Sequence, residues 1–357
     1  ASTTRVVGTN ANEVVATNAT GTGGFLASNY DITYVSGSLE ITQKALTITS
    51  DARSTTYGTA LVLGTTNFTE VGLINGDSIT GVTLKQGNNS TVPGTQGAGT
   101  YSGATDGILA SAAQGTGLSN YAITYAPGTL TINKATLTVT ADDKTRVYGD
   151  TNPSLTYSIT GYLNSQDATS AGITGAPTIS TTATASSNVT TYAITSAAND
   201  LAAANYQFSY VDGTLTINRR PVTVTADNKT RVYGDANPVL TFAVATDGAG
   251  TSRGMYNSQT LSGAVTTTAG SSTNVGNVSI TQGTVTNTDN ANYDITYNNG
   301  TLAITARPIT LTATDRTKVY GDALTLGTSA FTKTAGTYAN SELATAVTLT
   351  SVNGYAA

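Results

Sequence analysis

The sequence lacks cysteine, histidine and tryptophan, and it contains a single methionine. Without cysteine there is no disulfide framework and no thiolate metal site, so each domain has to be stable through burial alone. Without histidine, and with only four glutamates, the usual general bases and transition-metal ligands are nearly absent. We therefore expect no enzymatic activity and no cofactor.

Charge and long apolar runs are also scarce. Only 10% of the residues are charged and the net charge is -5, which argues against a nucleic-acid partner. No run of 18 apolar residues occurs, so we expect no membrane insertion. Threonine, valine and 37 glycines are plentiful instead, and these residues suit short strands and frequent turns. An all-β chain of several domains is predicted.

Two short blocks recur four times along the chain. The first block contains an Asn-Tyr pair and a glycine turn, and the second ends in Tyr-Gly. The tyrosines of the two blocks are 27 residues apart every time, whereas successive copies are offset by 91, 85 and 87 residues. All variation in length therefore falls outside this constant block. The four tyrosine pairs are Tyr30 and Tyr57, Tyr121 and Tyr148, Tyr206 and Tyr233, and Tyr293 and Tyr320.

Inside the constant block the apolar residues alternate, and the alternation changes parity once. Leu130 and Ile132 are followed by Leu137 and Val139, and the other copies show the same change. Because strand side chains alternate faces, the parity change indicates that the chain leaves one core and enters the next. The predicted domains are residues 1–43 (partial), 44–134, 135–219, 220–306 and 307–357 (partial). Linkers of two or three residues predict domains held end to end, and the mid-domain ends predict a longer parent chain.

Three motifs occur together: K-A-[LT]-[LT]-[IV]-T, K-T-[RK]-V-Y-G-D and N-Y-x-[IF]-[ST]-Y-x-x-G-[TS]-L-x-I. In this combination the chain resembles the MBG/YDG-type repeats of large bacterial exoproteins and adhesins of the filamentous-haemagglutinin, two-partner-secretion kind. The resemblance implies small, mostly-β, β-grasp-like domains in an elongated tandem array, with a short helical crossing at residues 76–79 and 164–168. The residues alone leave an immunoglobulin-like sandwich open.

Aspartates cluster near each predicted boundary and are the candidate metal ligands. Oxygen ligands that converge between domains could bind calcium and stiffen the joint. Ordinary turn chemistry explains them as well, because aspartate before glycine or beside Asn-Pro bonds to the nearby backbone, and no calcium-loop spacing is present. We favour turns over a metal site. The candidates are Asp142, Asp143, Asp150, Asp227 and Asp235.

Basic residues occupy repeated positions two residues apart, so that strand geometry would put them on one face. Such a strip could attract an acidic polysaccharide or a neighbouring filament. The alternative, which we favour, is that outward charges protect an edge strand from pairing with other chains. The strip would comprise Arg53, Lys144, Arg146, Lys229, Arg231, Arg316 and Lys318.

The tyrosines Tyr34, Tyr125, Tyr210 and Tyr297 recur beside a glycine turn. An aromatic ring packed in the core, with its hydroxyl on a backbone partner, is the expected role, and sugar stacking is the alternative.

The leading functional prediction is a structural stalk or fibre segment of a secreted bacterial surface adhesin, acting as a spacer in cell adhesion or in a biofilm matrix. Composition and resemblance place it outside the cell, on the bacterial surface. Its expected partners are neighbouring repeats of the same chain. Multivalent binding of glycan or exopolysaccharide, or self-assembly with like filaments, remain as alternatives.

Overall fold

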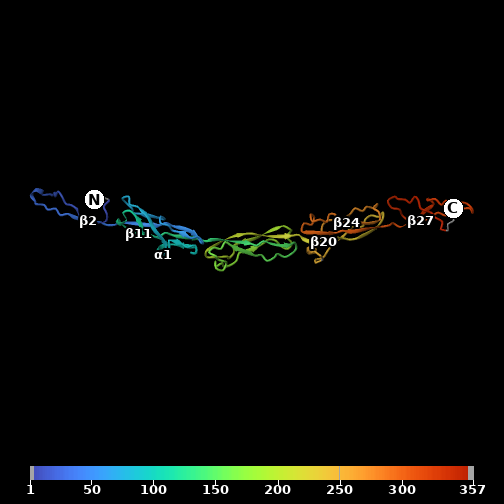
Figure 1. The fold of residues 1–357 in the computed structure, drawn as a ribbon, viewed down its shortest axis with the longest axis horizontal. Coiled ribbons are helices and arrows are strands. Elements are labelled where there is room, and N and C mark those ends of the chain that lie inside the picture. Colours follow the sequence, from blue (N-terminus) through green and yellow to red (C-terminus); the bar gives the residue numbers. More distant parts are fainter. Residues whose placement is uncertain (1–3, 249, 353–357) are drawn as a thin grey trace. The chain divides into compact units, whose positions relative to one another are not determined.

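The computed structural model describes residues 4–248 and 250–352, and strands dominate it (Figure 1). The described residues form two compact units. Unit 1 contains the chain up to Ala141 together with Tyr157–Ile179 and Thr195–Asp212. Unit 2 contains Asp142–Thr156, Ser180–Ile194 and the chain from Gly213 onward. We refer to residues 44–134, 135–219 and 220–306 as repeats 1, 2 and 3.

Repeat 1 lies in unit 1 and is built around two sheets that each contain one parallel pair. The sheet order is β11-β3-β6 in one and β4-β12-β9 in the other, and the pairs β7-β10 and β5-β8 complete the repeat. Its elements are β3 (Lys44–Ser50), β4 (Arg53–Thr56), β5 (Leu61–Val62), β6 (Phe68–Val71), β7 (Ile79–Gln86), β8 (Thr91–Val92), β9 (Gly99–Tyr101), α1 (Gly103–Asp106), β10 (Ile108–Gly115), η2 (Leu118–Asn120), β11 (Tyr121–Ala126) and β12 (Leu130–Asn133).

Repeat 2 is divided between the two units. The sheet β15-β13-β18 belongs to unit 1, and the parallel pair β14-β19 belongs to unit 2 with the adjoining part of β17. Its strands are β13 (Ala135–Ala141), β14 (Lys144–Val147), β15 (Tyr157–Thr160), β16 (Thr178–Ser180), β17 (Thr191–Ala197), β18 (Tyr206–Val211) and β19 (Gly213–Asn218).

Repeat 3 lies wholly in unit 2 and has two sheets, of order β22-β20-β25 and β21-β26-β24-β23. Its elements are β20 (Arg220–Ala226), β21 (Lys229–Val232), β22 (Phe242–Val244), η3 (Tyr256–Ser258), β23 (Thr266–Thr267), β24 (Gly276–Thr281), β25 (Tyr293–Asn298) and β26 (Gly300–Thr305). Tandem, small, mostly-β units are therefore the architecture, as the sequence predicted.

The flanking partial repeats contain one hairpin-like pair each. In the first, β1 (Gly8–Val14) pairs antiparallel with β2 (Gly37–Ile41), and η1 (Ala27–Asn29) lies between them. In the last, β27 (Ile309–Ala313) pairs antiparallel with β28 (Phe331–Gly336).

The core follows the period-2 alternation of the strands. Leu130 and Ile132 of β12 are buried, then Asn133 and Lys134 are exposed, and burial resumes at Ala135 with the opposite parity. One contiguous apolar cluster in unit 1 includes both Leu46 and Ile48 of repeat 1 and Leu137 and Tyr206 of repeat 2. The first two repeats therefore share buried surface at their contact.

The expected helical crossing is wrong. Residues 76–79 and 164–168 form turns that lead into strand or loop. Asn164 and Ser165 have φ of 52° and 58°, and Asn75 and Gly76 have φ of 60° and 77°. Consecutive left-handed residues cannot continue a right-handed helix, so the chain turns sharply at both places.

The repeat junctions as candidate functional site

The junction of repeats 1 and 2 is formed around two buried tyrosines within unit 1. Tyr57 follows β4 and belongs to the Tyr-Gly block, and Tyr206 begins β18 and belongs to the Asn-Tyr block of the next repeat. Their rings meet edge to face at 5.3 Å and 80°, and they are 4% and 1% exposed. Edge-to-face aromatic pairs add about 0.5–1.5 kcal/mol to the burial of their surface. The signature tyrosines thus join two repeats.

The side chain of Gln166 bridges both tyrosines. The hydroxyl of Tyr57 donates to Gln166 Oε1 at 3.1 Å, and that of Tyr206 donates to the same oxygen at 2.6 Å. The Leu163 N–H in turn donates to the Tyr206 hydroxyl at 3.0 Å. A buried hydroxyl without a partner is costly, so this shared acceptor fixes the register of the two repeats.

The glycine after the junction tyrosine permits close approach of the next repeat. Gly58 has a φ of 92°, and a Cβ placed on it would overlap Leu163 Cδ1. The Gly94 carbonyl oxygen also takes part in this contact. It accepts the Gly58 N–H at 2.8 Å and Asn164 Nδ2 of the next repeat at 3.3 Å. Only glycine satisfies both the backbone angle and the space.

The asparagine of the Asn-Tyr block reaches back to the preceding repeat. Asn205 Oδ1 accepts the Ala98 N–H at 2.9 Å, beside the start of β9. Asn120 accepts the Val7 N–H at 3.0 Å where the first partial repeat meets repeat 1, and Asn292 accepts the Val189 N–H at 2.9 Å where repeat 2 meets repeat 3. The same side chain therefore satisfies an equivalent strand end at three junctions.

The junction of repeats 2 and 3, in unit 2, repeats this arrangement. Tyr148 meets Tyr256 at 5.4 Å and Tyr293 at 5.7 Å, both edge to face. Gln259 accepts from the Tyr293 hydroxyl at 2.5 Å and donates to the Tyr148 hydroxyl at 3.1 Å. A Cβ on Gly149 would lie 2.6 Å from Tyr256 Cδ2.

An arginine adds charge to this second junction. Arg220 is 8% exposed, and its guanidinium donates to the Gly254 carbonyl at 2.8 Å and to the Tyr148 carbonyl at 3.3 Å. Asp150 lies 3.5 Å from Arg220 and 2.8 Å from Arg253. The buried cation is thus paired and hydrogen-bonded, as burial of a charge requires. At the first junction Lys134 instead donates to the Ala203 carbonyl at 2.8 Å.

The third junction joins repeat 3 to the last partial repeat. The Tyr233 hydroxyl donates to Glu342, Arg307 pairs with Asp235, and a Cβ on Gly234 would overlap Ala339. The corresponding tyrosine of the last partial repeat, Tyr320, is 101% exposed. Tyr233, which the following turn contacts, is thus half-buried.

Burial raises the pKa of the tyrosine of the Asn-Tyr block at two junctions. Desolvation is the main cause for Tyr121, and the nearby Asp77 carboxylate, which accepts its hydroxyl at 2.8 Å, adds to it. Desolvation is again the main cause of the raised pKa of Tyr293. Both phenols are therefore held in the neutral form that donates to a junction acceptor.

The candidate calcium ligands are engaged by their own surroundings. Asp142 and Asp227 each accept from a threonine hydroxyl of the facing loop, and Asp143 accepts the Thr214 N–H at 2.6 Å. Asp150 and Asp235 pair with arginines. Across residues 4–248 and 250–352 no three acidic side chains converge on one point that could hold a metal ion.

The prediction of an exposed basic strip is wrong for two of its seven residues, which are buried. Arg146 and Arg231 are each only 6% exposed, because a loop of the same repeat lies over each guanidinium and accepts from it, at the Thr184 and Gly270 carbonyls. Arg53 donates to the Leu63 carbonyl at 3.1 Å and Lys144 to Thr156 Oγ1 at 2.7 Å. Only two of the seven are fully exposed, and these are Arg316 and Lys318 of the last partial repeat.

The buried arginine instead braces a loop through the Asn-Pro turn. Arg146 Nε donates to Asn152 Oδ1 at 2.8 Å, and Asn152 Nδ2 donates to the Ala183 carbonyl at 2.6 Å. In repeat 3, Arg231 and Asn237 make the same two bonds, the second to the Ala269 carbonyl. Repeat 1 has neither Asn-Pro nor this arginine, and there Asn67 donates to the Leu63 carbonyl at 2.8 Å.

The four tyrosines expected in the core are only partly buried. Tyr125 and Tyr297 are half-buried and bond to the backbone at Ala113 and Ile280, as expected for their hydroxyls. Tyr34 is 42% exposed and accepts the Ala19 N–H at 2.8 Å. Tyr210 is half-buried. The fully buried tyrosines belong to the junctions instead.

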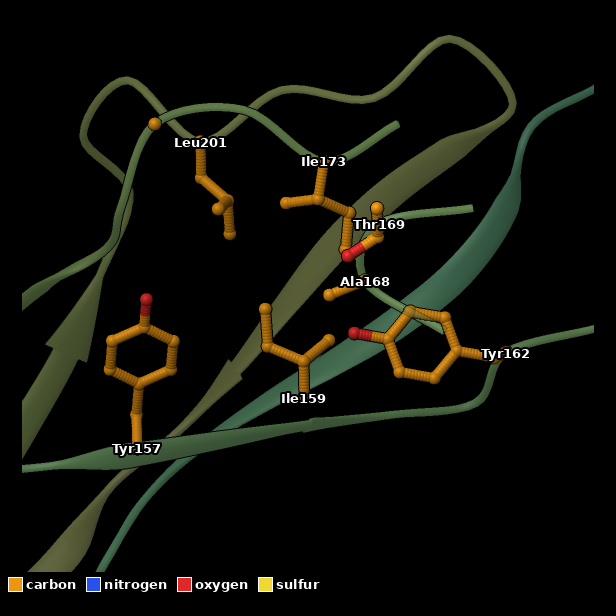
Figure 2. Close-up of a pocket in the computed structure, with 8 residues that line it drawn as sticks. Tyr157, Ile159, Tyr162, Ala168, Thr169, Ile173 and Leu201 are labelled. Atoms are coloured by element: carbon orange, nitrogen blue, oxygen red, sulfur yellow. The ribbon is translucent and has the colours of Figure 1, made fainter. Parts of the chain in front are cut away.

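A hollow of about 490 Å³ opens beside β15 in unit 1 (Figure 2). Figure 2 shows the hydroxyls of Tyr157 and Tyr162 directed into it, with Ile159 between them and Leu201 and Ile173 opposite. Burial is the main cause of a raised pKa at Tyr162. The hollow is open to solvent and combines apolar walls with two phenol groups.

Sequence reasoning missed the partners of the junction tyrosines. Gln166 and Gln259 are far from Tyr57 and Tyr148 in sequence, and Tyr57 and Tyr206 belong to different repeats. One signal was present: Asn-Ser followed by an acidic or amide residue recurs at residues 164–166, 257–259 and 340–342. All six of its Asn and Ser residues have positive φ.

Comparison with known proteins identifies the repeats. A search of curated proteins found no match. Over the described residues, no helix is long and apolar enough to cross a bilayer. The family model for the MBG domain (YGX type) matches three consecutive stretches, residues 46–131, 137–216 and 222–303. The Tyr-Gly turns of the three junctions lie within these stretches, and the chain belongs to the MBG domain family of the YGX type.

Proposed function

We propose that this tandem MBG chain is a structural spacer in a secreted bacterial surface adhesin, where it holds an adhesive end away from the cell. The observation that supports it is the junction itself. The signature residues Tyr57, Gly58, Gln166 and Tyr206 are used to fix one repeat on the next, rather than to form a reaction centre.

The linkers support the same role. Strand β12 ends at Asn133 and β13 begins at Ala135, while β19 ends at Asn218 and β20 begins at Arg220. A single intervening residue leaves little freedom between neighbours. The proposed chain therefore keeps a set length, and its partners are the adjoining repeats.

Small-angle X-ray scattering of the 357-residue chain tests the spacer. A compact body of about 88 residues is roughly 30 Å across, so three complete repeats in series would span about 90 Å, against about 50 Å for one globule of this length. We expect the longer dimension, independent of protein concentration. A compact profile, or one that grows with concentration, would contradict the spacer and favour self-assembly. A longest dimension that decreases only when EDTA is added would instead support calcium binding by the aspartates near the junctions.

Glycan binding is a second candidate, favoured by the tyrosine hollow of repeat 2. Tyr157 is 39% exposed, and neither its hydroxyl nor that of Tyr162 hydrogen-bonds to another described residue. Phenol rings with free hydroxyls suit a sugar ring, by packing and by hydrogen bonding. Calorimetric titration with neutral and acidic oligosaccharides should show binding that Y157A removes and F242A, at the corresponding position of repeat 3, keeps. Equal titrations for both variants would end this candidate.

A further inference from the structure

The first and last strands of each repeat form two parallel ladders, one in each sheet, and both ladders have the same offset in sequence. In repeat 1, Lys44–Thr49 pair with Tyr121–Ala126, and Arg53–Thr56 pair with Leu130–Asn133. The partners are 77 residues apart in both sheets, as 121 minus 44 and 130 minus 53 show. In repeat 3 the partners are 73 residues apart in both sheets, as 293 minus 220 and 302 minus 229 show.

These strands are also the ones that connect the repeat to its neighbours. The chain enters repeat 1 at β3 and leaves it at β12, one residue before β13 begins. A tension applied along the chain therefore reaches β3–β4 from one end and β11–β12 from the other. Because the paired strands are parallel, the two ends are pulled in opposite directions along the strand axis, and all the ladder bonds are loaded together.

We propose that each MBG repeat is a mechanical clamp, in which the parallel pairing of its first and last strands resists tension along the chain. The proposal deepens the spacer role, on which its biological meaning rests. The intervening segment, residues 57–120 in repeat 1, lies outside the path of the force.

Burial protects the ladder. Leu46, Ile48, Leu130 and Ile132 cover its inner face and are at most 3% exposed. In each sheet of repeat 1 one ladder strand is central, β3 between β11 and β6 and β12 between β4 and β9. The inner face of the ladders is therefore shielded from water, whereas Thr47 and Thr124 on the outer face are exposed.

The sequence pattern also separates the strands that would transmit the force from the rest of the repeat. The constant 27-residue block contains the last strands of one repeat and the first strands of the next, for example Tyr121 to Tyr148. The offsets of 91, 85 and 87 residues arise from differences in the remainder of the repeat. Length is thus constant where force would pass and variable where it would not.

Single-molecule pulling of the full chain in two directions tests the clamp. The chain has no cysteine, so a pair of introduced cysteines provides the only two attachment points. Q43C with N133C pulls repeat 1 from opposite ends of the ladder and shears it. Q43C with S119C pulls from one end, since Gln43 Nε2 lies 3.1 Å from the Ser119 carbonyl, and opens the ladder one bond at a time.

We expect a several-fold higher rupture force in the shearing direction at the same pulling speed, because forced unfolding depends on the barrier along the pulled direction. Thermal unfolding of both variants should match, which excludes a difference in stability. Equal rupture forces, or a weaker shearing direction, would overturn the clamp. An extended scattering profile together with equal rupture forces in the two directions would contradict the clamp and keep the spacer. A compact profile together with a higher rupture force in the shearing direction would contradict the spacer and keep the clamp.

Discussion

The glycine that follows the junction tyrosine meets two separate demands, one from its own backbone and one from the neighbouring repeat. Gly58, Gly149, Gly234 and Gly321 have φ between 86° and 92°, so all four occupy a region that other residues enter at a cost. At the first three a Cβ would collide with the next repeat, whereas at Gly321 nothing lies within 4 Å. The junction adds a steric requirement to a conformational one.

The substitution G58A should therefore cost more than backbone strain alone. A matched control is G87A, because Gly87 in the same repeat has a φ of 57° and open space around a Cβ. We expect G87A to lower the free energy of unfolding by about 1–2 kcal/mol and G58A to lower it further. Amide hydrogen exchange should rise at Leu163 in repeat 2 only for G58A. Equal losses, with exchange at Leu163 unchanged, would show that the glycine has no junction role.

At the scale of elements, the period of the repeat and the parity change were readable from sequence, and the strand partners were not. Alternation marks which side of a strand is buried, as at Leu130 and Ile132 against Leu137 and Val139. It says nothing about which distant strand pairs with it, and here β3 pairs with β11, 77 residues later. Parallel partners far apart in sequence leave no local signal.

The arginines show a second limit of sequence reasoning. A two-residue spacing places Lys144 and Arg146 on one face, but it does not say whether loops cover that face. The loop containing Ala183 and Thr184 does so, and it is anchored through Asn152. A position on an edge strand therefore does not by itself make a side chain exposed.

The substitution N152A should loosen this loop. It removes the bond to the Ala183 carbonyl and one acceptor of the buried Arg146, which should cost about 1–3 kcal/mol. N199A is a suitable control, because Asn199 is exposed and bonds only weakly, to its neighbour Asp200 at 3.4 Å. Denaturant unfolding measures the loss, and hydrogen exchange at Thr184 locates it. If both variants unfold alike, the brace is not stabilising.

At the scale of the whole molecule, alkaline pH acts on desolvated tyrosines, which are Tyr121 and Tyr293 at the junctions and Tyr162 and Tyr297 elsewhere. The pKa values of Tyr121 and Tyr293 are raised above 10.0 in the folded chain, chiefly by desolvation. The folded state therefore binds these protons more tightly than the unfolded state does. Stability is fully present below pH 10.0 and falls as pH rises through the folded pKa values.

Unfolding curves between neutral pH and strong alkali should show this fall. We expect a steady free energy of unfolding up to about pH 10 and a decline above it. Y121F should be less stable at neutral pH, since it loses the bond to Asp77, but it should decline less steeply in alkali. A decline of the same slope in Y121F and in the unmodified chain would show that Tyr121 is not responsible.

The edge-to-face tyrosines also give the chain an optical property. It has 19 tyrosines and no tryptophan to mask their emission or their near-ultraviolet dichroism. Rings held at fixed angles in an asymmetric setting, such as Tyr57 against Tyr206 and Tyr148 against Tyr293, are the source of such dichroism. The coming apart of neighbouring repeats is therefore visible by spectroscopy in the unlabelled chain, as a loss of aromatic signal while the backbone signal of the strands persists.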